Sequence, residues 1–333
     1  MSTSEQMTIV QAVNAALDDA MALDPTVFLL GEDIADGQGG GAVKCTKGLS
    51  TKYGVSRVRS TPIAEEAIVG AAVGAAIVGM RPVAEIMLMN FATVAMDQIT
   101  NHAAKLRFMS GGQTHVPLTL RMMTGAGFGT GGQHADMLEA WFAHTAGLKV
   151  VAPSTPADAY GLLLSSIFDD DPVIFIENLP LYFKPGPAPV RGTRIPLGKA
   201  NITRTGKDVT VIAYSRAAVD ALAAAQALAL EGIDVEVIDL RTVSPIDFDT
   251  VLNSVAKTGR AVVVHEAVRY CGIGAEVSAR ISEALFGKLR SPVERVGGYH
   301  CPVPFAKVLE NEFVPNPARI QAAIKKTVKG QEL

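Results

Sequence analysis

The alternation of apolar segments and one cluster of prolines constrain the fold of this chain more than any other feature. In residues 9–178 and again in 209–328, strand-like runs alternate with helix-like patterns, which is typical of mostly parallel sheets flanked by helices. Five prolines and three glycines fall between Leu179 and Gly198, and proline fixes the backbone and removes hydrogen-bond donors. We therefore predict two α/β domains, 1–180 and 199–333, joined by a Pro-rich linker at 181–198.

The predicted elements follow from hydrophobic period and from start and stop residues. In the first domain we expect strands at 27–30, 83–87, 118–123, 149–152 and 173–177, and helices at 9–21, 64–78, 92–109, 135–142 and 156–168. In the second we expect strands at 209–213, 234–239 and 261–265, and helices at 216–231, 248–257, 275–286 and 317–328. Small residues recur through the helix at 64–79, which predicts a close contact with another helix, across a subunit interface.

Composition favours a globular protein that meets a partner. Charged residues make up 19% of the 333, and 30 basic and 33 acidic residues are well mixed, so no basic surface for nucleic acid is expected. The mean hydropathy of +0.25 is high for a monomer of this size. Either much of the chain is deeply buried or a large apolar face contacts another subunit.

Cysteine use and the lack of targeting signals bear on location. Cys45, Cys271 and Cys301 are far apart, which fits a reducing compartment rather than a disulfide framework. The uncharged stretch 67–80 is too short to cross a bilayer, and the residues before Thr8 show no presequence pattern. The sequence therefore predicts a protein of the bacterial cytoplasm.

A glycine-rich run, Gly125–Gly132, contains the pattern GxGxxG between a predicted strand and a predicted helix. A dinucleotide site with this pattern also needs a carboxylate about 20 residues further on. The segment 150–154 reads Val-Val-Ala-Pro-Ser and has none. A flexible loop that carries a reactive side chain is the better interpretation, and His134 follows it directly. His134 is then either a surface or helix-capping residue or an active-site residue.

Two glutamates follow Thr61-Pro62 at the start of a predicted helix. Thr61 suits the N-cap and Pro62 the first helical position. Taken alone, Glu65 and Glu66 are best explained as complements to the positive end of the helix dipole. Similarly, Asp169–Pro172 is best explained as a solvated turn, although a cation site there is possible in principle. The six histidines show no metal-ligand spacing.

Ordered motifs run through nearly the whole chain and are specific when taken together. They are Gly31-Glu-Asp-Ile34, Thr61-Pro-Ile-Ala-Glu65, Met80-Arg-Pro-Val-Ala-Glu85, Asn90-Phe91, Met109-Ser-Gly-Gly112, Gln133-His134, Gly147-Leu-Lys-Val-Val151, Asp171-Pro-Val-Ile-Phe-Ile-Glu177, Asp239-Leu-Arg-Thr-Val-Ser-Pro245 and Gly272-Ile-Gly-Ala-Glu276. In order and spacing they resemble the beta subunit of thiamine-diphosphate-dependent 2-oxoacid dehydrogenase decarboxylases. That group covers the pyruvate, acetoin and branched-chain enzymes.

The resemblance implies a pyrimidine-binding domain followed by a transketolase C-terminal-like domain. It implies thiamine diphosphate between subunits, with Mg²⁺ and the diphosphate held mainly by an alpha chain through a GDG motif. This sequence has no GDG, which fits that division. The implied assembly is an α2β2 heterotetramer that serves a lipoyl-bearing acyltransferase core.

The resemblance also assigns roles to single residues. Glu65 matches the glutamate that contacts the pyrimidine ring nitrogen and tunes its proton. Phe91 matches the aromatic residue stacked on that ring, and Ile63 and Met87 match its apolar neighbours. His134 matches the histidine that assists reductive acyl transfer to lipoyl.

A potassium site and the substrate are the weaker implications. The family's potassium site, built largely from backbone carbonyl groups, corresponds to Leu118, Ser166, Ile167, Asp169 and Asp171. Ala135-Asp136 stands where many members have Ser-Gln, which affects the substrate more than the reaction class. We expect pyruvate, with acetoin or a branched-chain 2-oxoacid as alternatives. A split transketolase and a non-catalytic assembly subunit are the remaining alternatives.

Overall fold

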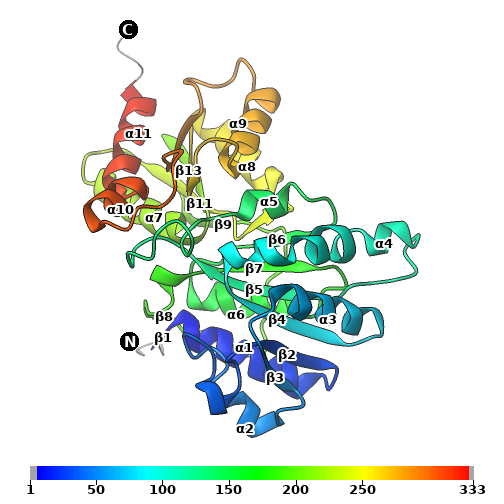
Figure 1. Ribbon diagram of the computed structural model, residues 1–333. Helices are drawn as coiled ribbons and strands as arrows, with labels where there is room; N and C mark the ends of the chain where they lie inside the picture. Colours follow the sequence, from blue (N-terminus) through cyan, green and yellow to red (C-terminus); the bar gives the residue numbers. More distant parts are fainter. Residues whose placement is uncertain (1–5, 330–333) are drawn as a thin grey trace. The chain divides into compact units, whose positions relative to one another are not determined.

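The structure is a computed structural model that describes residues 6–329 (Figure 1). The chain forms two compact units. The first comprises the residues up to Thr124 together with Trp141–Leu197, and the second comprises Gly125–Ala140 together with the residues from Gly198 onward. The segment Gly125–Ala140 therefore belongs to the C-terminal unit, although it lies well within the N-terminal half of the sequence.

The first unit is built on a parallel sheet of long apolar strands. Most strand residues are buried, as expected for a sheet covered on both faces. The strand order is β6 (Lys149–Val151), β7 (Val173–Asn178), β5 (Thr119–Thr124), β4 (Arg81–Leu88), β2 (Val27–Glu32) and β3 (Val58–Thr61). Strands β1 (Gln6–Met7) and β8 (Gly186–Pro187) form a separate, small antiparallel pair.

Helices cover both faces of this sheet (Figure 1). The crossover from β3 to β4 through α3 (Glu65–Ile77) and the one from β6 to β7 through α6 (Pro156–Ile167) run in opposite directions across the sheet. Because such crossovers are right-handed, α3 and α6 lie on opposite faces. Helix α1 (Ile9–Leu23) packs along α6 and begins with the predicted capping box of Thr8 and Gln11. The shorter elements are η1 (Asp36–Gln38), α2 (Leu49–Tyr53) and η4 (Leu179–Leu181).

Three helix predictions in the first half of the chain were wrong in detail. Residues 92–109 form η2 (Met89–Ala95), η3 (Gln98–Ala103) and α4 (Leu106–Met109) instead of one α-helix. Threonine hydroxyls bond back to backbone carbonyl groups here, at 2.9 Å for Thr93 to Asn90 and 2.7 Å for Thr100 to Met96, and such bonds compete with regular helix geometry. Helix α3 has Ala64 and not Thr61 as its N-cap.

The third error concerns the segment after the glycine-rich run. Helix α5 (Glu139–Ala143) begins four residues later than predicted, so His134 lies in a turn and not at a helix start. Propensity overestimated this helix: Ala135, its predicted first residue, instead packs with Val303 and Phe313 in an apolar cluster of the C-terminal unit.

The second unit is a smaller α/β domain. Its sheet has the order β14 (Glu294–Gly298), β13 (Ala261–Val268), β10 (Val209–Ala213), β11 (Val235–Asp239) and β9 (Asn201–Arg204), and only β9 runs antiparallel among these pairs. Helices α7 (Ser215–Ala229) and α11 (Pro317–Lys329) pack together on the sheet, as do α8 (Phe248–Thr258) and α9 (Ile273–Ala284). The remaining elements are β12 (Thr242–Ser244) and α10 (Lys307–Phe313). The predicted fold class, two α/β domains with mostly parallel sheets, is confirmed.

Two predictions from composition can be compared with the structure. Within residues 6–329, no helix combines the length and apolar character needed to cross a membrane. Cys45, Cys271 and Cys301 are free thiols; Cys45 is buried, and the other two are exposed.

Candidate active site

Residues from three neighbouring strands of the first unit meet at one edge of its sheet. Strand β2 ends at Glu32, β3 ends four residues before Glu65, and β4 carries Met87 near its end and is followed by Phe91. Since the carboxyl ends of parallel strands lie at the same edge, these residues come together there. Helix α3 also packs against β4 and η2. We call this edge, formed by the ends of β2, β3 and β4, the carboxyl edge.

Glu65 is a buried carboxylate at a helix N-terminus. It is the first residue of α3 and only 7% exposed, and the Ala64 N-cap offers no side-chain acceptor to the first turn. Glu66 is exposed, and its side chain accepts a hydrogen bond from Gln98 at 3.3 Å. The two glutamates therefore point to different environments, as expected for adjacent helical residues about 100° apart. Only Glu65 faces the interior.

Glu32 is a second buried carboxylate at the carboxyl edge, and the sequence analysis did not single it out. Its Oε1 atom has no hydrogen-bond partner among the described residues. Burial raises the pKa of Glu32, and the charges of Glu65, Asp33 and Glu85 raise it further. A buried acceptor without a partner is costly, so it marks a place that a ligand donor fits. The available signal was a carboxylate at the end of an otherwise apolar strand.

The predicted ring neighbours differ in exposure. Met87 and Phe91 are half-buried, whereas Ile63 is 81% exposed in this chain. The residues described in this chain therefore do not bury Ile63.

A buried ion network lies in the same sheet as the carboxyl edge. Arg121 on β5 donates to Glu85 on β4 at 2.6 Å, and to both carboxylate oxygens of Glu177 on β7 at 2.7 and 2.8 Å. The hydroxyl of Tyr182 donates to Glu177 as well. Burial would lower the pKa of Arg121, but the carboxylates of Glu177 and Glu85 raise it well above its usual value. A small cavity is lined by Glu85, Arg121 and Glu177 of this network and by Met87, one of the predicted ring neighbours.

His134 lies in the second unit, at the end of the glycine loop (Gly125–Gly132). It is half-buried, and its backbone N–H donates to the carbonyl of Gly131 at 3.2 Å. The N–H groups of Gly127 and Gly129 donate to the carboxylate of Glu310, at 2.6 and 3.0 Å. Helix α5 begins only at residue 139. Because a protein carboxylate takes these N–H groups and no helix follows the glycines directly, the loop does not have the geometry of a dinucleotide site.

A second group of buried titratable side chains lies in the C-terminal unit. The Tyr214 hydroxyl donates to the Glu139 carboxyl group, and Tyr214 also stacks on His265 with ring centroids 6.2 Å apart. Burial raises the pKa of Glu139 to about 7, although the Tyr214 bond opposes it, and Glu266 raises it further. Burial lowers the pKa of His265 to about 4. Near pH 6, Glu139 therefore keeps its proton and His265 stays neutral.

This pair makes opposite contributions to the pH dependence of stability. Folding raises the pKa of Glu139 from 4.5, so the contribution of Glu139 to stability is lost as the pH rises toward 7. Folding lowers the pKa of His265 from 6.5, so the contribution of His265 to stability is lost as the pH falls toward 4. In Glu139→Gln only the histidine contribution remains. As the pH rises from 4.5 to 7, the parent loses the stabilisation from Glu139, whereas the variant has none to lose. We therefore expect the free energy of unfolding of the variant, relative to that of the parent, to increase by roughly 3 kcal/mol over this range. Thermal unfolding of the assembled protein across this range measures it, and parallel curves for parent and variant would contradict it.

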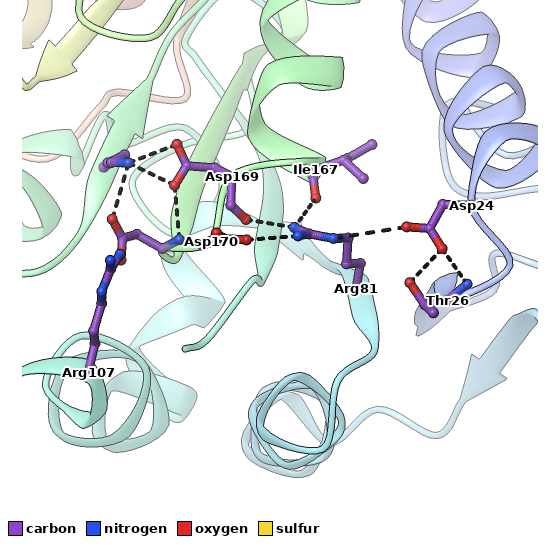
Figure 2. Close-up of polar contacts among 9 residues, drawn as sticks. Asp24, Thr26, Arg81, Arg107, Ile167, Asp169 and Asp170 are labelled. Carbon is purple, nitrogen blue, oxygen red and sulfur yellow. Dashed lines mark hydrogen bonds and ion pairs between the residues drawn. The ribbon is translucent and has the colours of Figure 1, made fainter. Parts of the chain in front are cut away.

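Of the five residues predicted to hold potassium, Ser166 and Ile167 end α6, and Asp169 and Asp171 lie in the turn that follows it; Ile167 and Asp169 are labelled in Figure 2. The fifth, Leu118, lies just before β5. The carbonyl groups of Ile167 and Asp169 accept hydrogen bonds from Arg81 at 3.3 and 3.0 Å, and the Asp169 carboxylate accepts from Lys149 at 2.7 Å. The carbonyl groups of Leu118 and Ser166 accept from backbone N–H groups, and Asp171 pairs with Arg107. Three protein cations, Arg81, Arg107 and Lys149, already contact these residues.

The second unit also contains a cavity of about 550 Å³ whose lining includes Arg269, Tyr270, Arg295, Tyr299, His300 and Arg319. None of the predicted site residues lines it. It is therefore no part of the candidate active site.

Comparison with protein families identifies two domains in this chain. Residues 5–184 match the transketolase pyrimidine-binding domain, and residues 198–320 match the transketolase C-terminal domain. Among solved structures, an inactive beta4 tetramer of a split-gene transketolase aligns with a TM-score of 0.78 and 22% identity, covering 97% of this chain and 98% of the other. The transketolase of Leishmania mexicana aligns with a TM-score of 0.71 and 17% identity, covering 99% of this chain and 46% of the other. The chain thus has the transketolase fold.

Curated relatives narrow the class. The beta subunit of acetoin:2,6-dichlorophenolindophenol oxidoreductase from Cupriavidus necator is 48% identical over 98% of this chain and 99% of its own length. The mitochondrial pyruvate dehydrogenase E1 component subunit beta-2 from Oryza sativa is 46% identical over 98% of this chain and 87% of its own length. The mitochondrial pyruvate dehydrogenase E1 component subunit beta from Bos taurus is 44% identical over 97% of this chain and 91% of its own length. The chain belongs to the family of these beta subunits, as the sequence motifs predicted.

Proposed function

We propose that this chain is the beta subunit of a thiamine-diphosphate-dependent 2-oxoacid dehydrogenase. It would take part in the oxidative decarboxylation of a 2-oxoacid, with pyruvate as the expected substrate, and in the reductive acylation of a lipoyl group. The observation that carries the proposal is the buried carboxylate of Glu65 beside the unpartnered Oε1 of Glu32 at the carboxyl edge. The curated relatives are named as subunits of oxidoreductases of this kind.

The residues at the carboxyl edge fit the pyrimidine end of that cofactor. Thiamine diphosphate, when bound, supplies the acidic carbon that attacks the 2-oxo group. Glu65, the first residue of α3, would hold a proton at a ring nitrogen. Met87 and Phe91 would pack on the ring and exclude water, and Glu32 would accept a hydrogen bond from it. His134 would donate a proton to the sulfur released when the lipoyl disulfide opens.

An alpha subunit would complete the site, in an α2β2 heterotetramer. It would hold Mg²⁺ and the diphosphate, because this sequence has no GDG motif. Helix α3 supports such a contact: Ala67, Ala71 and Gly74 are small, exposed residues at helical spacing, and a Cβ added at Gly74 would meet no atom within 4 Å. Light scattering of the co-purified subunits would test the stoichiometry, and a stable beta-only species lacking the alpha chain would count against it.

Three further assignments remain predictions. We propose potassium at Leu118, Ser166, Ile167, Asp169 and Asp171, which a rise in unfolding temperature in K⁺ relative to Na⁺ would test. We also propose a bacterial cytoplasmic location and domain boundaries at 180 and 198, which cell fractionation and limited proteolysis would test. Failure of any of these leaves the proposed reaction untouched.

The experiment for the proposed function is a substrate panel. The chain is co-purified with its alpha subunit and given thiamine diphosphate, Mg²⁺ and a lipoyl domain, and decarboxylation is measured for pyruvate, branched-chain 2-oxoacids and acetoin cleavage. We expect one of these substrates to dominate and turnover to acylate the lipoyl domain. Transfer of a two-carbon unit to a sugar, indifferent to the lipoyl domain, would instead indicate a transketolase. An intact assembly without any turnover would indicate a non-catalytic subunit.

Acetoin is the alternative substrate with specific support. The Cupriavidus necator relative, which matches this chain over nearly its whole length, is named for acetoin. In the panel, acetoin cleavage faster than pyruvate decarboxylation would favour it.

A further inference from the structure

The glycine loop that ends at His134 is held by side chains far away in the sequence. Ala126 and Ala135, on either side of residues 127–134, are almost fully buried in one small apolar cluster with Val303, Phe313 and Val314. The loop therefore leaves and re-enters the same part of the C-terminal core. Its glycines have positive φ at 125, 127, 129 and 131, so its backbone path is one that few other residues can adopt.

Glu310 is the main polar attachment of this loop. Glu310 lies on α10 and is fully buried. Its Oε1 atom accepts hydrogen bonds from the backbone N–H groups of both Gly127 and Gly129. Lys307, one turn earlier, donates to the carbonyl of Gly127 at 2.7 Å and to the other oxygen of Glu310 at 3.2 Å. Burial alone would raise the pKa of Glu310, but these N–H groups and Lys307 hold it below its usual value. Glu310 is thus a permanent anion at neutral pH, and two backbone groups are fixed to it.

Other contacts fix the loop at its ends. The Glu266 carboxylate accepts the N–H of Ala126 at 2.6 Å, and Arg216 donates to the carbonyl of Ala126 at 2.7 Å. At the far end, a Cβ on Gly131 would lie 2.4 Å from the ring of Phe305, so that ring lies directly against the backbone. Between these ends, Glu310 is the described side chain that holds the middle of the loop through two backbone N–H groups.

We propose that Glu310 is a positioning residue that sets, through the glycine loop, where the His134 side chain lies for transfer to lipoyl. The inference rests on the role given to His134 in the proposed function. A carboxylate that binds two N–H groups five and seven residues before His134 fixes the path of the intervening backbone. Reaction rates are sensitive to such placement, since an error of about 1 Å can cost on the order of 10²-fold. Glu310 itself need touch neither cofactor nor substrate.

The test uses the assembled enzyme and two assays. One follows acylation of a lipoyl domain, which needs His134, and the other follows reduction of 2,6-dichlorophenolindophenol, which accepts electrons without lipoyl. In Glu310→Ala we expect kcat of the lipoyl assay to fall about 10- to 100-fold while dye reduction changes little. Glu310→Gln should recover part of the loss, because its amide oxygen can accept the same two N–H groups. Glu312→Gln, an exposed position on the same helix, is the matched control and should leave both assays unchanged.

A double-mutant cycle separates positioning from stability. If Glu310 acts through His134, adding Glu310→Ala to His134→Ala should cause little further loss in the lipoyl assay. Additive losses, or an equal fall in both assays, would overturn the inference. If Glu310→Ala does not assemble, Lys307→Met decides: a smaller but selective loss in the lipoyl assay supports the proposal, and an unchanged ratio of the two rates refutes it.

The same variants distinguish this inference from the proposed function. Full lipoyl acylation by His134→Ala would remove the role of His134, and the positioning role would fall with it. A strong loss in His134→Ala together with unchanged rates in Glu310→Ala would leave the proposed function standing and refute the positioning role alone.

Discussion

Glu65→Gln in the assembled enzyme is expected to lower kcat by about 10²–10⁴-fold, the usual contribution of a positioned acid or base. Glutamine keeps the size of the side chain and still fills the buried position at the start of α3. It cannot share a proton with a ring nitrogen as a carboxylate does. Assembly and unfolding temperature should therefore change little while turnover of the preferred substrate is lost. Steady-state decarboxylation with saturating thiamine diphosphate measures the effect.

Glu66→Gln is the matched control for this prediction. It makes the same chemical change one residue away, at an exposed side chain whose partner is Gln98. We expect its turnover to match the parent. Turnover of Glu65→Gln at the parental rate would remove the catalytic assignment, and an equal loss in both variants would point to a general effect on the start of α3.

Arg121→Met is expected to destabilise the protein by about 3–5 kcal/mol, the usual cost of breaking a buried ion pair. Arg121 is 2% exposed and compensates two carboxylates, Glu85 and Glu177. Methionine fills much of the space but leaves both carboxylates without a cation. For a unit of this size each kcal/mol corresponds to roughly 2–4 °C in unfolding temperature, so the shift should be large. Calorimetry of the assembled protein measures it.

The control for Arg121 is an arginine whose ion pair is exposed. Arg280 lies 3.4 Å from Glu283, and their side chains are 50% and 70% exposed. Arg280→Met should cost at most about 1 kcal/mol, because water screens such pairs. Equal shifts in the unfolding temperatures of Arg121→Met and Arg280→Met would contradict the view that burial makes the Arg121 ion pairs important for stability. Recovery of stability on lowering the pH in Arg121→Met would support it, since protonation removes the uncompensated charge.

Local sequence signals predicted the framework of the fold well. The long apolar strands, such as β7 and β13, and the helices α1, α6, α7, α8 and α11 appear within a few residues of their predicted bounds. These segments have strong hydrophobic periodicity and are stabilised by it in the structure. The segment 92–109 was mispredicted because its threonines bond to nearby carbonyl groups, which a count of apolar residues does not register.

The candidate site was predicted only in part. The motif that contains Glu65 assigned it to the cofactor. Its residue type and its position at a helix start favoured only a favourable interaction with the positive end of the helix dipole. Glu32 was overlooked because its meaning depends on the absence of a partner for Oε1 among the described residues, which is a property of the packed structure. Likewise, the five predicted potassium ligands gave no hint that Arg81 and Lys149 lie among them (Figure 2).

The sequence by itself determined the parallel strands, and with them the edge at which Glu65, Met87 and Phe91 gather, because strand periodicity and crossover handedness act locally along the chain. Only the tertiary structure decided that Gly125–Ala140 joins the C-terminal unit and that Glu310 holds its glycine loop. Those bonds join residues 181 and 183 positions apart. Hydrogen bonds between such distant groups leave no periodic trace in the sequence and form only when both partners are already packed in one core.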